Sequence, residues 1–146
     1  MKIYMICTGN TCRSPMAEAI LRAKELEGVE VRSAGIHAMD GAPISSNAQQ
    51  LIEEAGMPYT PVSHMLSEED LEWADAVLTM TAAHRSVLHQ AYPDLAHKIF
   101  TIKEFVRPDA MEDVQDPFGG SLETYRRTFE ELMQIMDELE RKLTEG

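Results

Sequence analysis

Short apolar runs alternate along the chain with longer segments of helical periodicity. Four runs are apolar almost throughout and are bounded by turn-forming residues, at positions 3–6, 29–32, 76–80 and 98–102. Continuous apolar runs of this length are typical of strands buried on both faces of a parallel sheet. The pattern therefore predicts four parallel strands.

Helices are predicted in the intervals between these strands. The first begins at Ser14 and Pro15, where proline suits the opening turn, and its face runs through Leu26 to a stop at Gly28. Shorter patterns predict helices over about residues 46–55, 67–73 and 81–91. Each interval therefore holds the helix that a parallel connection needs.

The last predicted helix has the most regular pattern. Its apolar positions recur at spacings of 4, 3, 4, 3 and 4, through Tyr125, Phe129, Leu132, Met136, Leu139 and Leu143. This spacing places all of them on one stripe of a helix. A coiled-coil dimer usually needs more heptads with patterned flanks, so we expect the stripe to pack against the sheet.

The alternation of strands and helices predicts an α/β fold, a three-layer sandwich with helices on both faces of a four-stranded parallel sheet. The length suits one domain over residues 1–146. Ligands bind such sheets at the carboxyl ends of the strands. Two loops are candidates: residues 7–14, directly after the first strand, and residues 103–120, which are too many for a simple connection.

The charge balance narrows the classes of partner. The chain has 25 acidic and 13 basic residues, a formal net charge of −12, which disfavours nucleic acid and anionic membranes because both reward a basic face. No run of about 18 apolar residues is present, and the N-terminal run is too short for a signal peptide. We expect a cytoplasmic monomer without a cofactor. No metal site is expected either, because His84 and His89 point to different faces of one helix.

The only two cysteines lie in the first loop, which reads Cys7-Thr8-Gly9-Asn10-Thr11-Cys12-Arg13-Ser14. Between a strand and a helix, this sequence predicts a turn whose N–H groups converge on an oxyanion, with strained dihedrals at Gly9 and a left-handed conformation at Asn10. The positive end of the next helix and the planar fork of Arg13 add to the same site. The dinucleotide-binding and nucleotide-binding lysine motifs are absent.

Cys7 lies where this positive field is strongest. Helix N-termini and arginine stabilise a thiolate, so the groups that bind a phosphate dianion would also hold Cys7 as a nucleophile. Ser14 could donate a hydrogen bond to the sulfur. The alternative is a small buried side chain at a strand end, which leaves the arginine and the glycine-asparagine turn unexplained.

Phosphoryl transfer also needs a proton for the leaving group. The second loop supplies Asp116, followed by a proline, Phe118 and two glycines. The turn would present the carboxyl group, and Phe118 would form a wall of the pocket. The alternative is that Asp116 is a solvated surface charge. The neighbouring acids Asp109, Glu112 and Asp113 have no comparable context.

Together these features resemble the low-molecular-weight protein tyrosine phosphatases, and among them the bacterial protein-arginine phosphatases most closely. The resemblance covers nearly the whole chain, at residues 7–14, 33–35, 63–64, 75–80 and 116–121. It implies that Cys7 attacks phosphorus to form a phosphocysteine and that Arg13 and the loop amides bind the phosphoryl group. It also implies that Asp116 acts first as acid and then as base, on phosphorylated proteins.

The resemblance assigns further residues to the site. Asn10, Ser14, Ser33 and His64 match the polar network that supports the loop. The substrate-binding residues would be Thr8, Gly9, Asn10, Thr11, Cys12, Ser14 and Phe118.

Thr11 is expected to decide the substrate. Tyrosine-directed members usually carry a larger aliphatic residue here, whereas arginine phosphatases carry threonine, whose hydroxyl suits a polar guanidinium. Phe118-Gly119, in place of two aromatic residues, and Thr81, in place of an acid, point the same way. His37 occupies the position expected to wall the pocket and is not the aromatic hydrocarbon expected there. Phosphotyrosine remains the alternative substrate.

Other interpretations have weaker support. Arsenate reductases share the fold and the loop but use further cysteines downstream, and none follows Cys12. A phosphate-binding protein without activity would not need Cys7, Arg13 and Asp116 together, and an interaction module would need none of them. Cys12 itself is either a packing residue or a resolving thiol that captures oxidised Cys7 in a disulfide, which would make the enzyme redox-sensitive.

Overall fold

The computed structural model describes residues 1–108 and 113–145. Its strands are all parallel and lie in the order β2-β1-β3-β4. Their bounds are β1 (Lys2–Cys7), β2 (Glu30–Gly35), β3 (Ala76–Thr79) and β4 (Ile99–Thr101). The predicted four-stranded parallel sheet is therefore confirmed.

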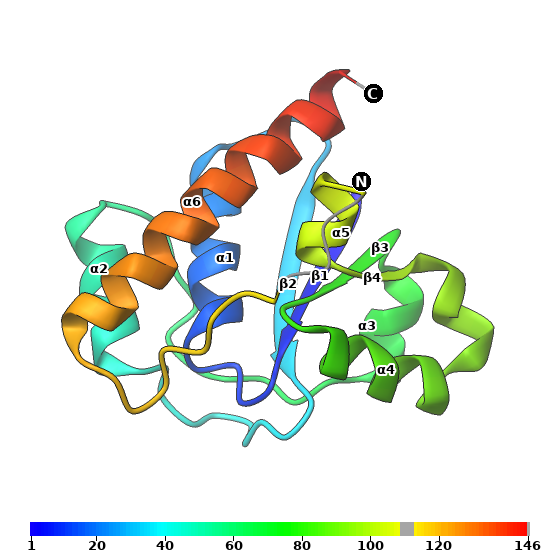
Figure 1. The fold of residues 1–146 in the computed structure, drawn as a ribbon, viewed down its shortest axis with the longest axis horizontal. Helices are drawn as coiled ribbons and strands as arrows, with labels where there is room; N and C mark the ends of the chain where they lie inside the picture. The colour runs from blue at the N-terminus through cyan, green and yellow to red at the C-terminus, as the bar shows by residue number, and fades with distance from the viewer. Residues whose placement is uncertain (109–112, 146) are drawn as a thin grey trace.

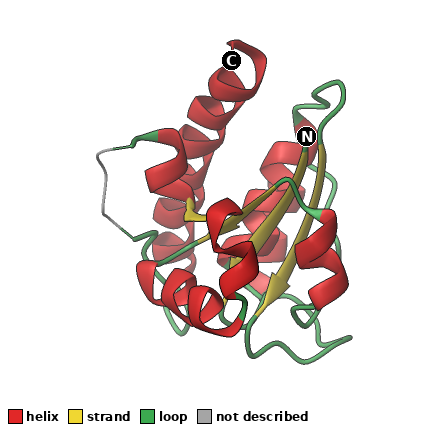
Figure 2. Cartoon of the chain, turned by 90° about the vertical axis from the view of Figure 1, so that its right-hand side faces the viewer, coloured by secondary structure: helices red, strands yellow, loops and turns green. Residues whose placement is uncertain are grey.

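Helices lie on both sides of this sheet, as predicted (Figure 1). One side carries α1 (Arg13–Ala23), α2 (Ser46–Glu54), α5 (Ile102–Val106) and α6 (Leu122–Glu145). The other carries α3 (Glu68–Trp73) and α4 (Ala82–Ala91), and a 3-10 turn, η1 (Pro93–Lys98), leads into β4. In Figure 2, which is turned by 90° from Figure 1, helices lie in front of the strands and behind them. Within the described residues, no helix combines the length and the apolar character needed to cross a membrane.

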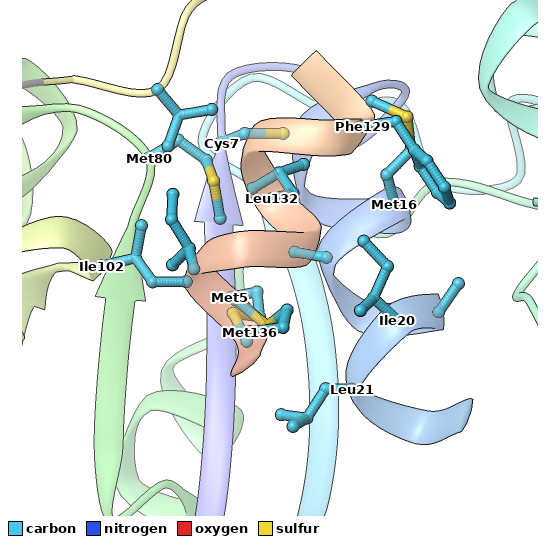
Figure 3. Close-up of a cluster of buried hydrophobic side chains, with 14 of the residues drawn as sticks. Met5, Cys7, Met16, Ile20, Leu21, Met80, Ile102, Phe129, Leu132 and Met136 are labelled. Carbon is cyan, nitrogen blue, oxygen red and sulfur yellow. The ribbon is translucent and has the colours of Figure 1, made fainter. Parts of the chain in front are cut away.

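The larger core fills the space between the sheet and helices α1 and α6 (Figure 3). Met5 and Cys7 from β1 lie in one cluster with Leu132 and Met136 from α6. Leu132, Met136 and Leu139 are fully buried, and each such side chain contributes about 1.5–3 kcal/mol to folding. The predicted packing of the α6 stripe is confirmed.

The first helix is shorter than predicted. α1 ends at Ala23 rather than near Gly28, because Glu25 and Gly28 have positive φ angles of 47° and 76°. Residues in this conformation do not continue a right-handed helix. Leu26, which the pattern places on the helix face, instead packs against the core from the turn that follows.

β2 continues past its predicted end at Arg32 to Gly35, pairing with β1 along its whole length. The polar Ser33 interrupts the apolar pattern, but the ladder is formed by backbone groups and tolerates it. This extension brings Gly35 beside Cys7, at the carboxyl edge of the sheet.

The loop predicted over residues 103–120 is helical at its start. The Thr101 hydroxyl accepts from the Glu104 backbone N–H, and the Glu104 carboxylate accepts from the Thr101 N–H, a capping box that begins α5. A helix of five residues is too short for hydrophobic periodicity to reveal. From Asp113 to Gly120 the chain passes the carboxyl end of β3, where Val114 bonds to Met80, and then leads into α6 (Figure 1).

Candidate active site

The predicted phosphate-binding loop lies at the carboxyl end of β1. Cys7 ends β1 and Arg13 begins α1, so the loop joins a strand to a helix N-terminus, as expected. A cavity of about 250 Å³ opens there, lined by Cys7, Thr8, Gly9, Thr11, Cys12, Arg13, Asp116 and Phe118. The fold thus brings the two loops selected from the sequence to opposite walls of one cavity.

Two hydrogen-bonding groups converge on the Cys7 sulfur. The Asn10 backbone N–H donates to Sγ at 3.2 Å, and Ser14 Oγ lies 2.8 Å from Sγ. Because Ser14 Oγ accepts from Asn10 Nδ2 at 2.8 Å, its own proton is available to the sulfur. Both groups and the N-terminus of α1 thus place positive hydrogen-bonding ends against the Cys7 sulfur.

Asn10 holds the loop in this shape. It is 1% exposed and has a φ of 54°, so the left-handed conformation predicted for it is present. Its Nδ2 also donates to Ser33 Oγ at 3.0 Å, and its Oδ1 accepts the backbone N–H of His64 at 2.7 Å. Because both ends of the amide are bonded, the side chain stabilises a left-handed backbone conformation that is otherwise unfavourable for residues other than glycine.

The glycine that the loop depends on is not the one expected. Gly9 has no positive φ, and a Cβ there would make only an ordinary contact, 3.6 Å from Thr11 Oγ1. A Cβ at Gly35, in contrast, would lie 2.5 Å from the Thr8 carbonyl oxygen and 2.7 Å from the Asn10 nitrogen. The close approach of β2 to the loop therefore requires glycine at position 35, which the sequence marked only through its resemblance.

The supporting network continues from Ser33 to a buried carboxylate. Ser33 Oγ donates to Glu18 Oε1, and Thr60 Oγ1 donates to Glu18 Oε2 at 3.0 Å. The sequence did not single out Glu18, because an acidic residue in an amphipathic helix is ordinarily solvated. His64 contributes its backbone N–H to Asn10, while its side chain lines a separate cavity beside Glu18.

Arg13 and Asp116 line the same cavity and form an ion pair there. The Arg13 side chain is 5% exposed; Nη1 donates to the Val114 carbonyl at 3.1 Å, and Nη2 lies 3.6 Å from Asp116 Oδ2. Asp116 Oδ1 accepts the Phe118 backbone N–H at 3.0 Å, within a turn that Gly120 closes onto Pro117. The turn thus directs one carboxylate oxygen toward the cavity, and Phe118, although largely exposed, lines its mouth.

Comparison with known proteins agrees with this geometry. The model of the family described as low molecular weight phosphotyrosine protein phosphatase matches residues 2–146. The chain belongs to this family.

Solved structures of the family share its fold. The YwlE arginine phosphatase from Geobacillus stearothermophilus is 43% identical, with a TM-score of 0.95, covering 98% of this chain and 92% of its own. A YwlE C7S mutant with a phosphorylated active-site serine is 40% identical, with a TM-score of 0.93 and coverages of 99% and 96%. A low molecular weight protein tyrosine phosphatase from T. tengcongensis is 46% identical, with a TM-score of 0.89 and coverages of 97% and 99%.

The sequence offers His84 only as a candidate metal ligand, but the structure places it against the phosphatase loop. His84, the third residue of α4, places Nε2 2.8 Å from Thr8 Oγ1. Burial, together with the charge of Arg13, lowers the pKa of His84 to about 4, so the ring is neutral at pH 7. His84 therefore fixes the first loop residue after the nucleophile without adding a charge. Among the described residues, no group of three or more metal-ligating side chains is assembled.

The second cysteine of the phosphatase loop is a buried, protonated thiol. Cys12 Sγ lies 3.2 Å from the Tyr125 hydroxyl and 3.5 Å from Thr11 Oγ1. Burial raises the pKa of Cys12 and, with the contact to Cys12, raises that of Tyr125 to about 12. Cys7 and Cys12 are both free thiols in this structure.

The remaining candidates have structural positions. His37 donates its backbone N–H to the Thr8 carbonyl at 2.8 Å and is not among the described residues that line the cavity. Thr81 caps α4, and Asp113 Oδ1 accepts the first N–H of that helix. Asp109 and Glu112 lie outside the described residues.

Proposed function

We propose that this family member is a cysteine-dependent phosphatase that hydrolyses phosphoarginine in proteins. The observation that carries the proposal is the single cavity in which the donor-bound sulfur of Cys7, the buried guanidinium of Arg13 and the carboxylate of Asp116 meet. Thr11 supplies the polar wall beside them. The named arginine phosphatases with 40–43% identity support the same activity.

The first step would transfer the phosphoryl group to the enzyme. The Cys7 thiolate attacks phosphorus and forms an S–P bond while the P–N bond to the arginine breaks. Asp116, in its protonated form, gives its proton to the departing guanidine nitrogen. Arg13 and the loop amides stabilise the negative charge on the phosphoryl oxygens, and Ser14 stabilises the charge on the sulfur.

The second step would release inorganic phosphate and regenerate the Cys7 thiolate. Asp116, now a carboxylate, takes a proton from a water molecule that attacks phosphorus, and the S–P bond breaks. The products are inorganic phosphate and the Cys7 thiolate, held again by Asn10 and Ser14. The phosphorylated serine of the C7S relative supports a covalent intermediate at this position.

Phosphotyrosine is the second candidate substrate. The tyrosine phosphatase from T. tengcongensis is 46% identical to this chain, and Phe118 exposes 77% of its surface at the mouth, where it can contact a phenol ring. The smaller, hydroxyl-bearing Thr11 favours phosphoarginine, because a polar guanidinium needs a hydrogen-bonding wall.

The test compares kcat/KM for matched phosphoarginine and phosphotyrosine peptides at one pH. The wild type should prefer phosphoarginine. Thr11→Ile should shift the ratio toward phosphotyrosine by about tenfold or more, because it removes the hydroxyl from the wall. Thr11→Ser keeps the hydroxyl and serves as the matched control. A ratio unchanged in the isoleucine variant would contradict the specificity proposal.

We also propose that Cys12 is a resolving thiol. Peroxide would oxidise the Cys7 thiolate to a sulfenic acid, and attack by the Cys12 sulfur would form the disulfide and release water. Cys12 lines the same cavity as Cys7, which supports this. Mass spectrometry after peroxide treatment should find the internal disulfide; sulfinic acid at Cys7 without it would overturn the proposal.

The setting of the activity is proposed on charge and chemistry. We propose one phosphatase domain over residues 1–146, acting as a cytoplasmic monomer on phosphorylated proteins, with no nucleic acid, membrane or cofactor. The net charge of −12 and the two free thiols support this. The mass measured by light scattering should equal that of one 16.4 kDa chain.

A further inference from the structure

A lysine is buried beside the segment that carries Asp116. Lys103, in the short helix α5, is 3% exposed. Its Nζ donates to Glu131 Oε2 of α6 at 3.2 Å and to the backbone carbonyl of Asp113 at 3.2 Å. Burying an ammonium group is costly unless it is bonded. This lysine therefore anchors α5, α6 and the start of the acid-bearing segment at one point.

The backbone that Lys103 anchors leads directly to the catalytic groups. Asp113 Oδ1 accepts the Ala82 N–H at 2.8 Å. The next residue, Val114, donates its N–H to Met80 at 3.0 Å and accepts from Arg13 Nη1 at 3.1 Å. Asp116 follows two residues later. The bonds of Asp113 and Val114 thus hold the chain immediately before the Asp116 carboxylate.

We propose that Lys103 is a positioning residue for Asp116. Its bond to Asp113 is charge-assisted and 3.2 Å long, whereas the tether from Thr128 Oγ1 to the Gln115 carbonyl is neutral and 3.4 Å long. The inference rests on the proposed phosphatase activity. It deepens that proposal, because an error of about 1 Å in a catalytic group can cost about a hundredfold in rate.

The chemistry of the ion pair also distinguishes positioning from simple stabilisation. The Lys103 side chain is 4% exposed and that of Glu131 is 37% exposed, so only the lysine end of the pair is buried. An apolar side chain at such a buried position is often as stabilising as a charged one, so stability alone gives little reason for a lysine here. Glu131 Oε1 is buried and has no hydrogen-bond partner in the described part of the chain. The second carboxylate oxygen therefore adds no hydrogen bond to the stability of the pair.

The test uses the leaving group as its readout. A general acid matters for phenyl phosphate, whose leaving group needs a proton, and little for p-nitrophenyl phosphate, whose leaving group departs unaided. Lys103→Met should lower kcat/KM for phenyl phosphate by about tenfold or more and for p-nitrophenyl phosphate by less than about threefold. Lys103→Arg should restore most of the loss, because it keeps the charged donor.

Two variants separate positioning from loss of fold. Leu139→Ala weakens the packing of α6 away from the cavity, so it should lower thermal stability without any dependence on the leaving group. Glu131→Gln keeps the lysine bonded to Asp113 and should show the same leaving-group dependence as Lys103→Met, but smaller. It takes the place of Lys103→Met if that protein does not fold.

Each outcome decides one of the two proposals. If Asp116→Asn discriminates between the two substrates while Lys103→Met lowers both equally, the positioning role is overturned and the phosphatase activity stands. If the wild type hydrolyses neither aryl phosphate nor phosphoarginine peptide, the proposed function fails and the positioning role fails with it. Discrimination by both variants supports the inference.

Discussion

The loop of residues 7–14 and the segment from Asp113 to Gly120 form opposite walls of one cavity, yet they differ in burial and bonding. In the loop, Cys7, Asn10 and Arg13 are at most 4% exposed. In the segment, the Asp116 side chain is 54% exposed and Phe118 is 77% exposed. The side chains proposed to hold the phosphoryl group are thus buried, whereas the proposed acid and Phe118 are at the surface.

This difference matches what each wall has to do. Donors that stabilise charge in a transition state work best when they are fixed before the substrate arrives, which the bonds around Asn10 provide. The Asp116 side chain, in contrast, is exposed where a protein-bound phosphoryl group can reach it.

The largest expected effect comes from the nucleophile in the buried wall. Cys7→Ser should lower kcat by at least about 10⁴-fold, because a serine hydroxyl is not ionised in a site that stabilises a thiolate. Binding of inorganic phosphate, measured by calorimetry, should stay within about tenfold of the wild type, since the amides and Arg13 remain. Normal turnover in this variant would refute the assignment of Cys7.

The acid in the exposed wall should have a smaller and more selective effect. Asp116→Asn should reduce kcat/KM for phosphoarginine or phenyl phosphate by about 10²–10⁴-fold, and much less for activated aryl phosphates. Phosphate binding should change little, because Asp116 itself donates nothing to the dianion. An equal loss on all substrates would remove Asp116 from the role of general acid.

A pair of glycine substitutions compares the two walls directly. Gly35→Ala places a methyl group against the backbone of the loop and should cost about 3 kcal/mol or more, with weaker phosphate binding. Gly119→Ala meets nothing within 4 Å and strains only its own φ of 79°, at a cost of about 1–2 kcal/mol.

Urea unfolding and phosphate calorimetry on both glycine variants give the comparison. Equal losses of phosphate affinity would show that the buried wall is no more sensitive than the exposed one.

The smallest effect at neutral pH is expected at His84. Its pKa is lowered from 6.5 to about 4 in the folded protein, so the unfolded chain binds the extra proton more readily. The contribution of His84 to the free energy of unfolding is fully present above pH 6.5. It is lost as the pH falls toward 4, and its size is at most about 3 kcal/mol. His84→Gln removes this titration, so urea unfolding of the two proteins should diverge below pH 6.5. Parallel curves would contradict the assignment.

The sequence predicted the fold and the candidate reacting residues better than it predicted the residues that hold them in place. The apolar runs predicted the strands, and the spacing in α6 predicted its packing, because both patterns depend on neighbouring residues. The cavity brings together the predicted Cys7, Arg13 and Asp116.

The supports depend on contacts between distant segments, which no local pattern contains. Gly35 is required because β2 passes against the loop, and Glu18 is buried because Ser33 and Thr60 close over it. His84 reaches Thr8 only after α4 docks. α5 was missed because a single turn of helix has no period to detect.

The central position of β1 has a consequence for biosynthesis. Cys7, Cys12 and Arg13 are close together in the sequence, but the strands beside β1 begin at Glu30 and Ala76, and Arg13 and Cys12 bond to Val114 and Tyr125. Pairings this distant in sequence form late. On the ribosome, the site around Cys7 can therefore assemble only after the segments that pack on β1 and its loop, as far as Tyr125, have emerged.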